Sequence, residues 1–473
     1  MELKLPFIQK SRNFAPEEYN RIMTKQNNTH LELETKPVGR LLWQYALPSI
    51  IAMTASSLYN IVDRMFIGQC EGPLAISGLS VTFPFMNLSA AFGAAVGVGA
   101  SSFLSMKLGQ HDYSTAKVIL GNTTTLNVLV GIVFGVVSML FLDPILMFFG
   151  ASAETVPYAH EYMVWILLGN VFTHLYFGMN ALLRASSKPK KAMMATLFTV
   201  VLNAFLDYLF IYVIGMGIKG AAIATVISQF LAMCWQFWQF SNKNEVLHLE
   251  RSSLRIRGDI VKNIISIGIS PFSLNVCACI VVIFINNGLS HYGGYMEVGA
   301  YGIGNTIGMI FAMFCMGINQ GMQPIVGYNY GARKMDRVKK ALYMSMVVAT
   351  IITATATLVA FTCPTLACSI FTKDPDLLER SVAALQINLS VFFVVGFQMV
   401  VVNFFQSIGK AKLSIFLSLS RQLILLVPML IVFPLFLGLD GVWLSLPASD
   451  AGSAIIALIV FMTYKNKQLK SQH

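Results

Sequence analysis

Long apolar segments follow one another along almost the whole chain, and they limit its fold more than any other feature. Segments of 20 or more mostly apolar residues recur from about residue 41 to about residue 464. A helix needs about 20 apolar residues to cross the hydrocarbon core of a bilayer, where backbone groups find no water to bond. Only 12% of the residues are charged, against about 25% in soluble domains. The sequence therefore predicts an all-α integral membrane protein.

The apolar segments predict twelve transmembrane helices in two sets of six. A charged stretch at 242–260 separates the sets, and we expect a polar lead-in at 1–36 and a short tail at 465–473. The first six-helix unit would occupy 37–241 and the second 261–464. The predicted helices are 41–67, 75–106, 116–142, 156–183, 190–213, 219–241, 261–289, 297–328, 336–362, 378–407, 411–436 and 441–464.

The basic residues predict the orientation of the chain. Of its 33 Lys and Arg residues, 28 fall in the leading segment, in alternate loops and in the tail, and three fall in the opposite loops. Cytoplasmic loops carry the excess of Lys and Arg in membrane proteins, so both termini are expected in the cytoplasm. The net charge of +11 thus reflects topology, and we expect no nucleic-acid partner.

The two halves repeat each other at an offset of 220 to 223 residues. Because each unit has six spans, the copies have the same orientation, related by an axis along the membrane normal. Secondary transporters commonly use such parallel repeats, with a substrate path between the halves. The landmarks that match are Pro48 with Pro271, Gly109 with Gly331, Pro144 with Pro364, Lys188 with Lys410, and Gly220 with Gly441.

The stretch NAFLDYLFIY, residues 203–212, places an ionisable group at membrane depth. Asn203 and Asp207 are four residues apart, so on a helix they share a face and can bind one ion together. Acids at this depth are costly and usually mark an ion or substrate path. The alternative is that Asp207 caps or cross-links neighbouring helices.

Three further polar residues are predicted to lie at about the same depth in the membrane as Asp207. At about 1.5 Å of rise per residue, Asp207 lies roughly 25 Å from the cytoplasmic side of a layer about 30 Å thick. Asp63, Tyr162 and Thr225 fall at comparable depths in spans one, four and six. This candidate cation-coupling cluster therefore comes from four helices of the first half.

The second half lacks an equivalent cluster. Spans seven and ten hold no acid at membrane depth, so ion coupling is expected in the first half alone. Asp450 in span twelve is a weaker candidate, for which helix packing or capping is favoured. Arg64 is expected to reach the outer interface, although an ion pair with Asp63 or Asp207 is the alternative.

Two other residue types are candidates for weaker roles. Met309, Met313 and Met316 share one face of span eight, and flexible, polarisable side chains suit a cavity that accepts varied molecules. Plain packing is the alternative for each of them. His174 in span four is favoured as a hydrogen-bonded structural histidine over a proton relay.

The motifs YNIVDRMFIG in span one, NAFLDYLFIY in span five and MGIKGAAIAT after it closely resemble the MATE (multidrug and toxic compound extrusion) transporters. The resemblance covers residues 37–465 and is greatest to the bacterial multidrug-efflux branch with its coupling site in the N-terminal lobe. It implies a V-shaped pair of bundles that exports organic, often cationic, compounds in exchange for inward H⁺ or Na⁺.

The family pattern carries over to particular positions of this chain. Asp63 matches the family's acid in span one, and Tyr162 matches its tyrosine in span four. Asn203 and Asp207 match the family's pair in span five, and Thr225 matches its hydroxyl residue in span six. The resemblance implies a protein of the bacterial inner membrane, with no metal beyond Na⁺ at Asp63, Asn203, Asp207 and Thr225. We expect no cofactor, and nothing in the sequence demands more than a monomer. Another branch uses acids in spans seven and ten, which this chain lacks.

Three other functions compete with an antiporter. A lipid-linked oligosaccharide flippase shares the architecture, but it is expected to line its cavity with several basic residues, and only Arg64 and Arg421 lie within spans. A membrane enzyme is disfavoured because no HExxH, P-loop or GxSxG motif occurs. A passive channel would not need repeated halves with kinked helices and acids on one side.

Overall fold

The computed structural model describes residues 32–71 and 73–470, without the side chains of 58–65, 68–71, 73–74, 76 and 467–470. All regular elements in these residues are helices. Within the described ranges, nine helices are long and apolar enough to cross a membrane, and two bent pairs bring the number to eleven. With the 34-residue helix α2 (Val38–Glu71) the described chain has the twelve predicted spans, so the all-α membrane fold is confirmed.

The first six spans run from α2 to α9 and form what we call the N lobe. Their ends lie within a few residues of the prediction because the apolar segments end where polar loops begin. After α2 these elements are α3 (Pro73–Gly109), α4 (Tyr113–Leu140), α5 (Leu142–Phe148), α6 (Val156–Leu168), α7 (Asn170–Ala185), α8 (Pro189–Asp207), η1 (Tyr208–Val213) and α9 (Gly217–Ser241).

The last six spans form the C lobe. A short 3₁₀ turn, η2 (Arg251–Leu254), precedes them in the stretch between the lobes. The elements are α10 (Gly258–Gly293), α11 (Tyr295–Gly331), α12 (Met335–Thr362), α13 (Pro364–Ser369), α14 (Pro375–Leu389), η3 (Phe392–Val394), α15 (Val395–Ser407), α16 (Ala411–Leu419), η4 (Ser420–Leu426), α17 (Val427–Leu437) and α18 (Leu439–Lys470).

Four spans are bent or rewound at places that the sequence did not predict. Spans four and ten are bent pairs, with angles of 57° between α6 and α7 and 42° between α14 and α15. The first bend lies at Gly169, where a Cβ would overlap the side chain of Val226 on α9. Spans five and eleven contain π-helical turns, η1 and η4. Such turns often occur at functional sites.

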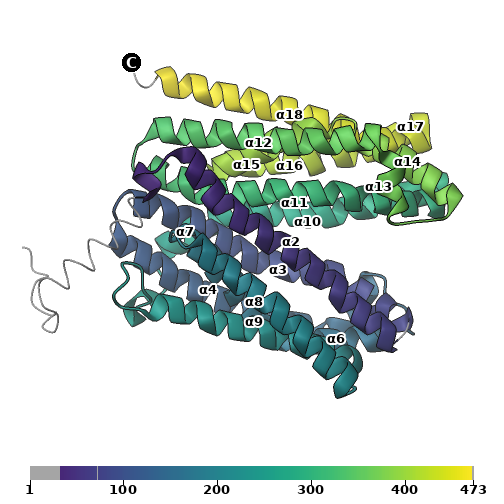
Figure 1. Ribbon diagram of the computed structural model, residues 1–473, viewed down its shortest axis with the longest axis horizontal. Coiled ribbons are helices and arrows are strands. Elements are labelled where there is room, and N and C mark those ends of the chain that lie inside the picture. The colour runs from purple at the N-terminus through teal and green to yellow at the C-terminus, as the bar shows by residue number, and fades with distance from the viewer. Residues whose placement is uncertain (1–31, 72, 471–473) are drawn as a thin grey trace, which may run out of the picture.

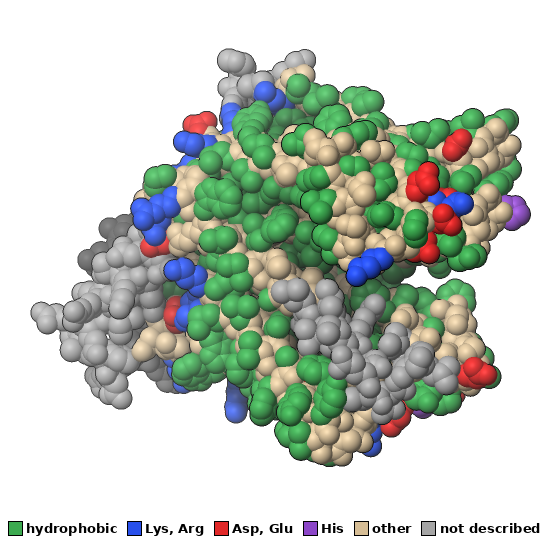
Figure 2. Space-filling view, turned by 45° about the vertical axis from the view of Figure 1, so that its right-hand side comes forward, with side chains coloured by type: hydrophobic (Ala, Val, Ile, Leu, Met, Phe, Trp, Pro, Cys, Tyr) green, Lys and Arg blue, Asp and Glu red, His purple; other side chains and the backbone are tan. Residues whose placement is uncertain are grey.

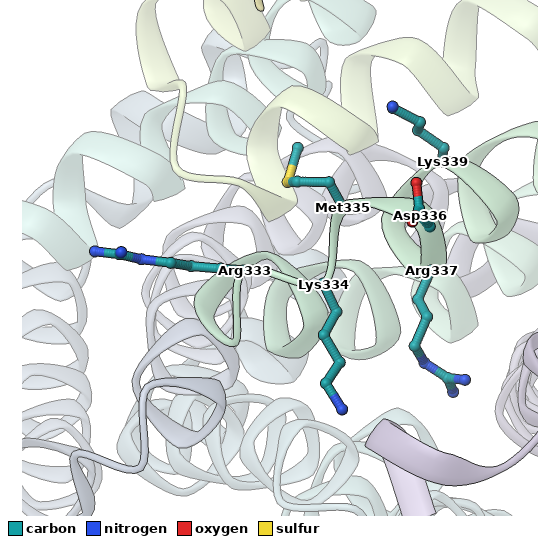
Figure 3. Close-up of a pocket in the computed structure, with 6 residues that line it drawn as sticks. All are labelled: Arg333, Lys334, Met335, Asp336, Arg337 and Lys339. Carbon is teal, nitrogen blue, oxygen red and sulfur yellow. The ribbon is translucent and has the colours of Figure 1, made fainter. Parts of the chain in front are cut away.

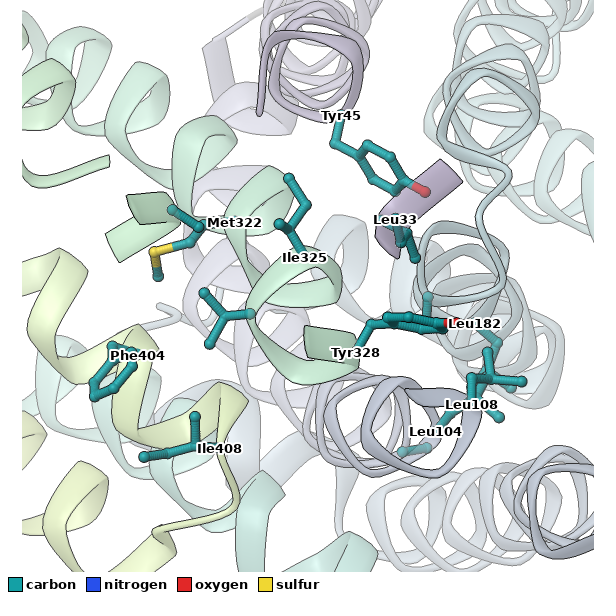
Figure 4. Close-up of a cluster of buried hydrophobic side chains, with 14 of the residues drawn as sticks. Leu33, Tyr45, Leu104, Leu108, Leu182, Met322, Ile325, Tyr328, Phe404 and Ile408 are labelled. Atoms are coloured by element: carbon teal, nitrogen blue, oxygen red, sulfur yellow. The ribbon is translucent and has the colours of Figure 1, made fainter. Parts of the chain in front are cut away.

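The two lobes lie side by side and diverge toward one end (Figure 1). At the other end, which we call the basic end, one hydrophobic core includes residues of both lobes, among them Leu104, Leu108, Met322 and Tyr328 (Figure 4). At the far end the cores are separate, because one contains N-lobe residues alone and two contain C-lobe residues alone. The molecule is therefore closed at the basic end and open between the lobes at the far end, where Figure 2 shows a hollow.

Glycines let the lobes approach at the basic end, and they follow the internal repeat. A Cβ at Gly109 on α3 would clash with the carbonyl oxygen of Tyr328 on α11. A Cβ at Gly331 would clash in the same way with the carbonyl oxygen of Met106. The two contacts are equivalent in the repeat, because Gly331 lies 222 residues after Gly109 and Tyr328 lies 222 residues after Met106. Such close helix contacts through glycine are common in membrane proteins.

The segment that leads into α2 crosses over to the C lobe at the basic end. Leu33 is fully buried, and its carbonyl oxygen accepts hydrogen bonds from Asn329 (3.1 Å) and Arg337 (3.0 Å). Glu34 forms an ion pair of 2.6 Å with Lys334, and this hydrogen bond is the main cause that lowers the pKa of Glu34. These contacts add to the closure of the basic end.

The stretch between the lobes packs against the N lobe. Asn122 on α4 donates to the carbonyl oxygens of Ser253 and Arg255, each at 3.0 Å, and accepts from the backbone N–H of Arg257 at 2.7 Å. Lys117 on α4 pairs with Glu250 at 2.7 Å. These groups hold the stretch to α4 as far as Arg257, and α10 of the C lobe begins at the next residue, Gly258.

Candidate functional site

The predicted cluster is centred on the last turn of α8, in the N lobe. Asn203 and Asp207 lie one turn apart there, and Thr225 lies on the neighbouring helix α9. Their exposed fractions are 1%, 0% and 3%. The structure thus brings together three of the five residues that the sequence predicted, and it buries them completely within the lobe.

The amide of Asn203 fits this site in one orientation. Its nitrogen then donates to Asp207 Oδ2 at 2.9 Å, and its oxygen accepts from the backbone N–H of Thr225 at 3.2 Å. The reverse orientation would set the amide oxygen against the carboxylate and the nitrogen against the N–H group, where neither could bond. The same amide lies 3.3 Å from the Thr225 hydroxyl. One neutral amide therefore links the carboxyl of α8 to the backbone of α9.

The helix changes its winding immediately after Asp207. Residues Tyr208–Val213 form the π-helical turn η1, and the backbone N–H of Ile214 donates to Leu209, five residues back. The N–H of Tyr208 is shared between the carbonyl oxygens of Ala204 and Phe205. Asp207 thus stands where an α-helix gives way to a wider turn, which the sequence did not predict.

Tyr162 is buried on α6, with 1% of its surface exposed. It belongs to the far-end core of the N lobe, together with Ile211 of η1 and Ile218 and Ala221 of α9. Those elements flank the Asp207 site, so Tyr162 lies in the same half of the lobe. The hydrogen bonds described for Asn203 do not include it.

The side chains of Asp63 and Arg64 lie outside the described residues. Their backbone belongs to α2, which packs against α8, α9 and η1. The predicted place of Asp63 in the cluster, and the predicted alternatives for Arg64, stay predictions.

One of the three candidate methionines of α11 contacts the N lobe. The sulfur of Met313 accepts a hydrogen bond of 3.1 Å from Ser57 on α2. Met309 and Met316 share that helical face and are 52% and 38% exposed. A fourth methionine that the sequence analysis overlooked, Met53 on α2, accepts from Gln320 at 3.5 Å. The face between α2 and α11 is therefore lined by thioethers from both lobes.

The C lobe holds a buried ion pair that the sequence analysis did not predict. Arg421 of η4 donates through Nε to Asp450 Oδ1 at 2.7 Å. The Asp450 side chain is 8% exposed and that of Arg421 26%. The two residues come from spans eleven and twelve, and only their proximity in the fold reveals the pair.

A surface hollow at the basic end is lined by residues of the turn between α11 and α12. Its side chains diverge from one another (Figure 3), and Lys334 and Arg337 bond to residues 33–36. This hollow is separate from the candidate site, because Asp207 lies toward the far end of the molecule. Its lining residues are Arg333, Lys334, Met335, Asp336, Arg337 and Lys339.

Comparison with known proteins places the chain among transporters. A family model described as MatE matches residues 48–209 and 267–432. The multidrug export protein MepA of Staphylococcus haemolyticus is 26% identical over 434 residues, which cover 92% of this chain and 95% of that protein. The structure of the MATE multidrug transporter DinF-BH is 35% identical, with a TM-score of 0.84 and coverage of 91% and 96%. A MATE family transporter in an outward-facing conformation has the same fold, with a TM-score of 0.86, 23% identity and coverage of 92% and 97%.

Proposed function

This chain belongs to the MatE family, and from that membership we propose that it is a secondary active multidrug exporter. It moves organic, often cationic, compounds out of the cell in exchange for a cation that enters. The similarity to a multidrug export protein and to a multidrug transporter supports this proposal. The loop charges support cytoplasmic termini, and we further propose that the protein acts as a monomer in the bacterial inner membrane.

The observation that carries the proposal is the buried carboxyl of Asp207 in the N lobe. A buried carboxyl is held in its charged form less readily than one in water, so it can bind and release a cation as its surroundings change. The partner described for it is the neutral amide of Asn203, which can remain bonded to either form of the acid. We assign Asp207 as the principal coupling residue, with Asn203 and Thr225 beside it and Asp63 and Tyr162 assisting.

The orientation of Asn203 favours H⁺ over Na⁺ as the coupling ion. Hard cations bind to oxygen ligands, but the amide presents its nitrogen to Asp207 and its oxygen to the Thr225 N–H. A Na⁺ shared by Asp207 and Asn203 would require the amide to turn over and give up both hydrogen bonds. A proton requires no such change.

The transport cycle alternates access between the two ends of the molecule. In this conformation the cleft opens at the far end and the basic end is closed. A proton from outside neutralises Asp207 and weakens, without breaking, its hydrogen bond from Asn203. The helix α2, which carries Pro48 and packs against α8, then bends. The drug leaves from the cleft, next to the methionines of α2 and α11. A membrane potential contributes about 2.3 kcal/mol per charge per 100 mV.

The test is ethidium efflux from cells or inside-out vesicles that contain wild type or Asp207→Asn. An imposed pH gradient is compared with an imposed Na⁺ gradient. We expect wild type to extrude dye under the pH gradient and the variant to be inactive, because an amide cannot bind the proton. Asp376→Asn, the same change at an exposed residue of α14, is the matched control.

Two outcomes would redirect the proposal. Full gradient-dependent efflux by Asp207→Asn would exclude Asp207 as the coupling residue. If neither gradient moves dye in wild type, a lipid-linked oligosaccharide becomes the substrate to test.

A further inference from the structure

A histidine at the centre of the N lobe has no part in the site described above. His174 lies on α7 and is fully buried. Its ring packs against α3 at Gly93, where a Cβ would stand 3.0 Å from the imidazole Cδ2. Phe134 on α4 closes another side, with ring centroids 6.3 Å apart. A glycine on α3 therefore makes the space that this imidazole occupies.

The hydrogen bonds around His174 determine which ring nitrogen carries its proton. Asn170 donates through Nδ2 to the carbonyl oxygen of Gly131 at 3.1 Å, which fixes its Oδ1 as an acceptor. The hydroxyl of Ser89 donates to that Oδ1 at 2.6 Å. Because a serine hydroxyl has one hydrogen, Ser89 can only accept from His174 Nε2, 3.3 Å away. The neutral imidazole thus bears its hydrogen on Nε2.

The other nitrogen, Nδ1, is then a bare acceptor. It is buried and has no hydrogen-bond partner among the described residues. The nearby Asn127 Oδ1 on α4 is a second buried acceptor without a described donor, and the amide of Asn127 lies against Gly178, one turn from His174. Buried acceptors without donors are rare and call for an explanation. A proton bound at Nδ1 would turn this bare acceptor into a donor.

The charged groups on helices packed against α7 do not account for this nitrogen. Asp207 is one of these groups, and the others are lysines at helix ends or residues near the far end of α6 and α11. Among the described contacts, none of them is a hydrogen-bond partner of His174. The remaining ionisable groups on these helices are tyrosines and cysteines, which are neutral near pH 7. The charged and histidine side chains are Lys107 on α3, Lys117 on α4, His160 and Glu161 on α6, Lys190, Lys191 and Asp207 on α8, Lys219 on α9 and Glu297 on α11.

A band of polar residues runs from Asp207 toward His174. Asn203 joins Asp207 to Thr225 on α9. One turn along α9, Gln229 accepts a hydrogen bond of 2.5 Å from Thr173, the neighbour of His174 in the chain. Polar side chains at membrane depth are costly, and this band leads from the proposed coupling carboxyl into the layer of the buried imidazole.

We propose that His174 is a second proton carrier of the N lobe, which binds one proton at Nδ1 in each transport cycle. The N–H bond forms at Nδ1 when a proton arrives from the open side, and the ring becomes an imidazolium. The same bond breaks when the proton leaves toward the basic side. This inference rests on the proposed proton antiport, and it sets the coupling ratio at two protons per drug, with Asp207 as the other carrier.

The test measures the limiting drug gradient in proteoliposomes at zero membrane potential. The logarithm of the ethidium ratio is plotted against the imposed pH difference, and the slope is the number of protons exchanged. We expect a slope of two for wild type and one for His174→Gln. Glutamine keeps an N–H donor for Ser89 but cannot take up a proton, so the variant's limiting ratio falls about tenfold per pH unit. Unchanged ethidium affinity shows that the variant is folded.

Equal slopes for wild type and His174→Gln would overturn the inference while leaving proton antiport intact. A slope of zero for wild type would instead overturn proton antiport, and the inference with it. If the variant does not fold, ¹⁵N-imidazole NMR of wild type decides the matter. The slowly exchanging histidine must gain a proton at Nδ1 on acidification, and a signal that stays neutral contradicts the proposal.

Discussion

The two lobes share one architecture, yet the partners described for their buried acids differ. Asp207 in the N lobe bonds to the neutral amide of Asn203. Asp450 in the C lobe bonds to the guanidinium of Arg421 at 2.7 Å. An arginine remains charged at every physiological pH, so the partner of Asp450 is a permanent cation. An amide imposes no charge on Asp207. On the proposed function, this difference assigns cation exchange to the N lobe and a structural role to the C-lobe pair, which is a prediction.

At the interface between the lobes, in contrast to the buried acids, the two halves make equivalent contacts. Gly109 meets the Tyr328 carbonyl and Gly331 meets the Met106 carbonyl, as equivalent contacts of the two halves. The surfaces through which the lobes meet are thus alike, whereas the buried acids inside the lobes have different partners. The predictions below test this division of roles.

The largest difference is expected between neutral substitutions of the two acids. Asp207→Asn should reduce gradient-driven efflux to the level of membranes without the protein, because the site can no longer change its charge. The double variant Arg421→Met/Asp450→Leu should retain that efflux, since it removes both charges of the pair together. Ethidium efflux under a fixed pH gradient measures both. Loss of efflux in the double variant would show that the C lobe also takes part in coupling.

The next effect concerns stability and falls on the C lobe. Asp450→Asn alone leaves the Arg421 charge buried without its carboxylate, and breaking such a pair costs about 3 to 5 kcal/mol. We expect the thermal unfolding midpoint in detergent to drop markedly for this variant and to recover in the double variant. Asp207→Asn should lower it far less. Equal losses for the two single variants would contradict the contrast between the lobes.

The symmetric glycines should respond alike. Gly109→Val and Gly331→Val each place a side chain against the facing carbonyl oxygen, and overpacking of this kind costs about 1 to 3 kcal/mol. Both variants should weaken closure at the basic end, and labelling of a cysteine at position 108 or 325, both buried there, measures the opening. Gly302→Val, where a Cβ meets nothing, is the control. A strong effect of one glycine alone would show that the interface has diverged as well.

The smallest effect is expected from the ion pair that joins the leading segment to the C lobe. Lys334 lowers the pKa of Glu34 from its ordinary value of 4.5, so the pair stabilises the protein above that pH. The contribution is lost as the pH falls through the lowered pKa. Because Lys334 is 41% exposed, solvent screens the pair to less than about 1 kcal/mol. Glu34→Gln should lower the unfolding midpoint slightly at pH 7, and the difference from wild type should vanish in acid.

The sequence predicted the fold well because membrane helices carry a strong signal. The apolar lengths placed α2, α9 and α12 to within a few residues, and the matched prolines and glycines revealed the repeat. Asn203, Asp207 and Thr225 could be grouped from depth alone, since rise per residue along a span is nearly constant.

Features that depend on contacts between distant residues could not be predicted. The bend at Gly169 follows from the Val226 side chain on another span. The Arg421–Asp450 pair depends on how spans eleven and twelve are rotated about their axes. The tautomer of His174 depends on a chain of donors through Ser89 and Asn170. Each needs the helix rotations that sequence spacing leaves open.

Cation release on drug binding tests the central role of Asp207 most directly. Ethidium is titrated into purified protein in weakly buffered detergent solution, and a pH indicator counts the protons released per dye molecule bound. The account predicts that Asp207→Asn releases one proton fewer than wild type, and that Arg421→Met/Asp450→Leu releases as many as wild type. If Asp207→Asn releases as many protons as wild type, Asp207 is not the residue at which drug and cation compete.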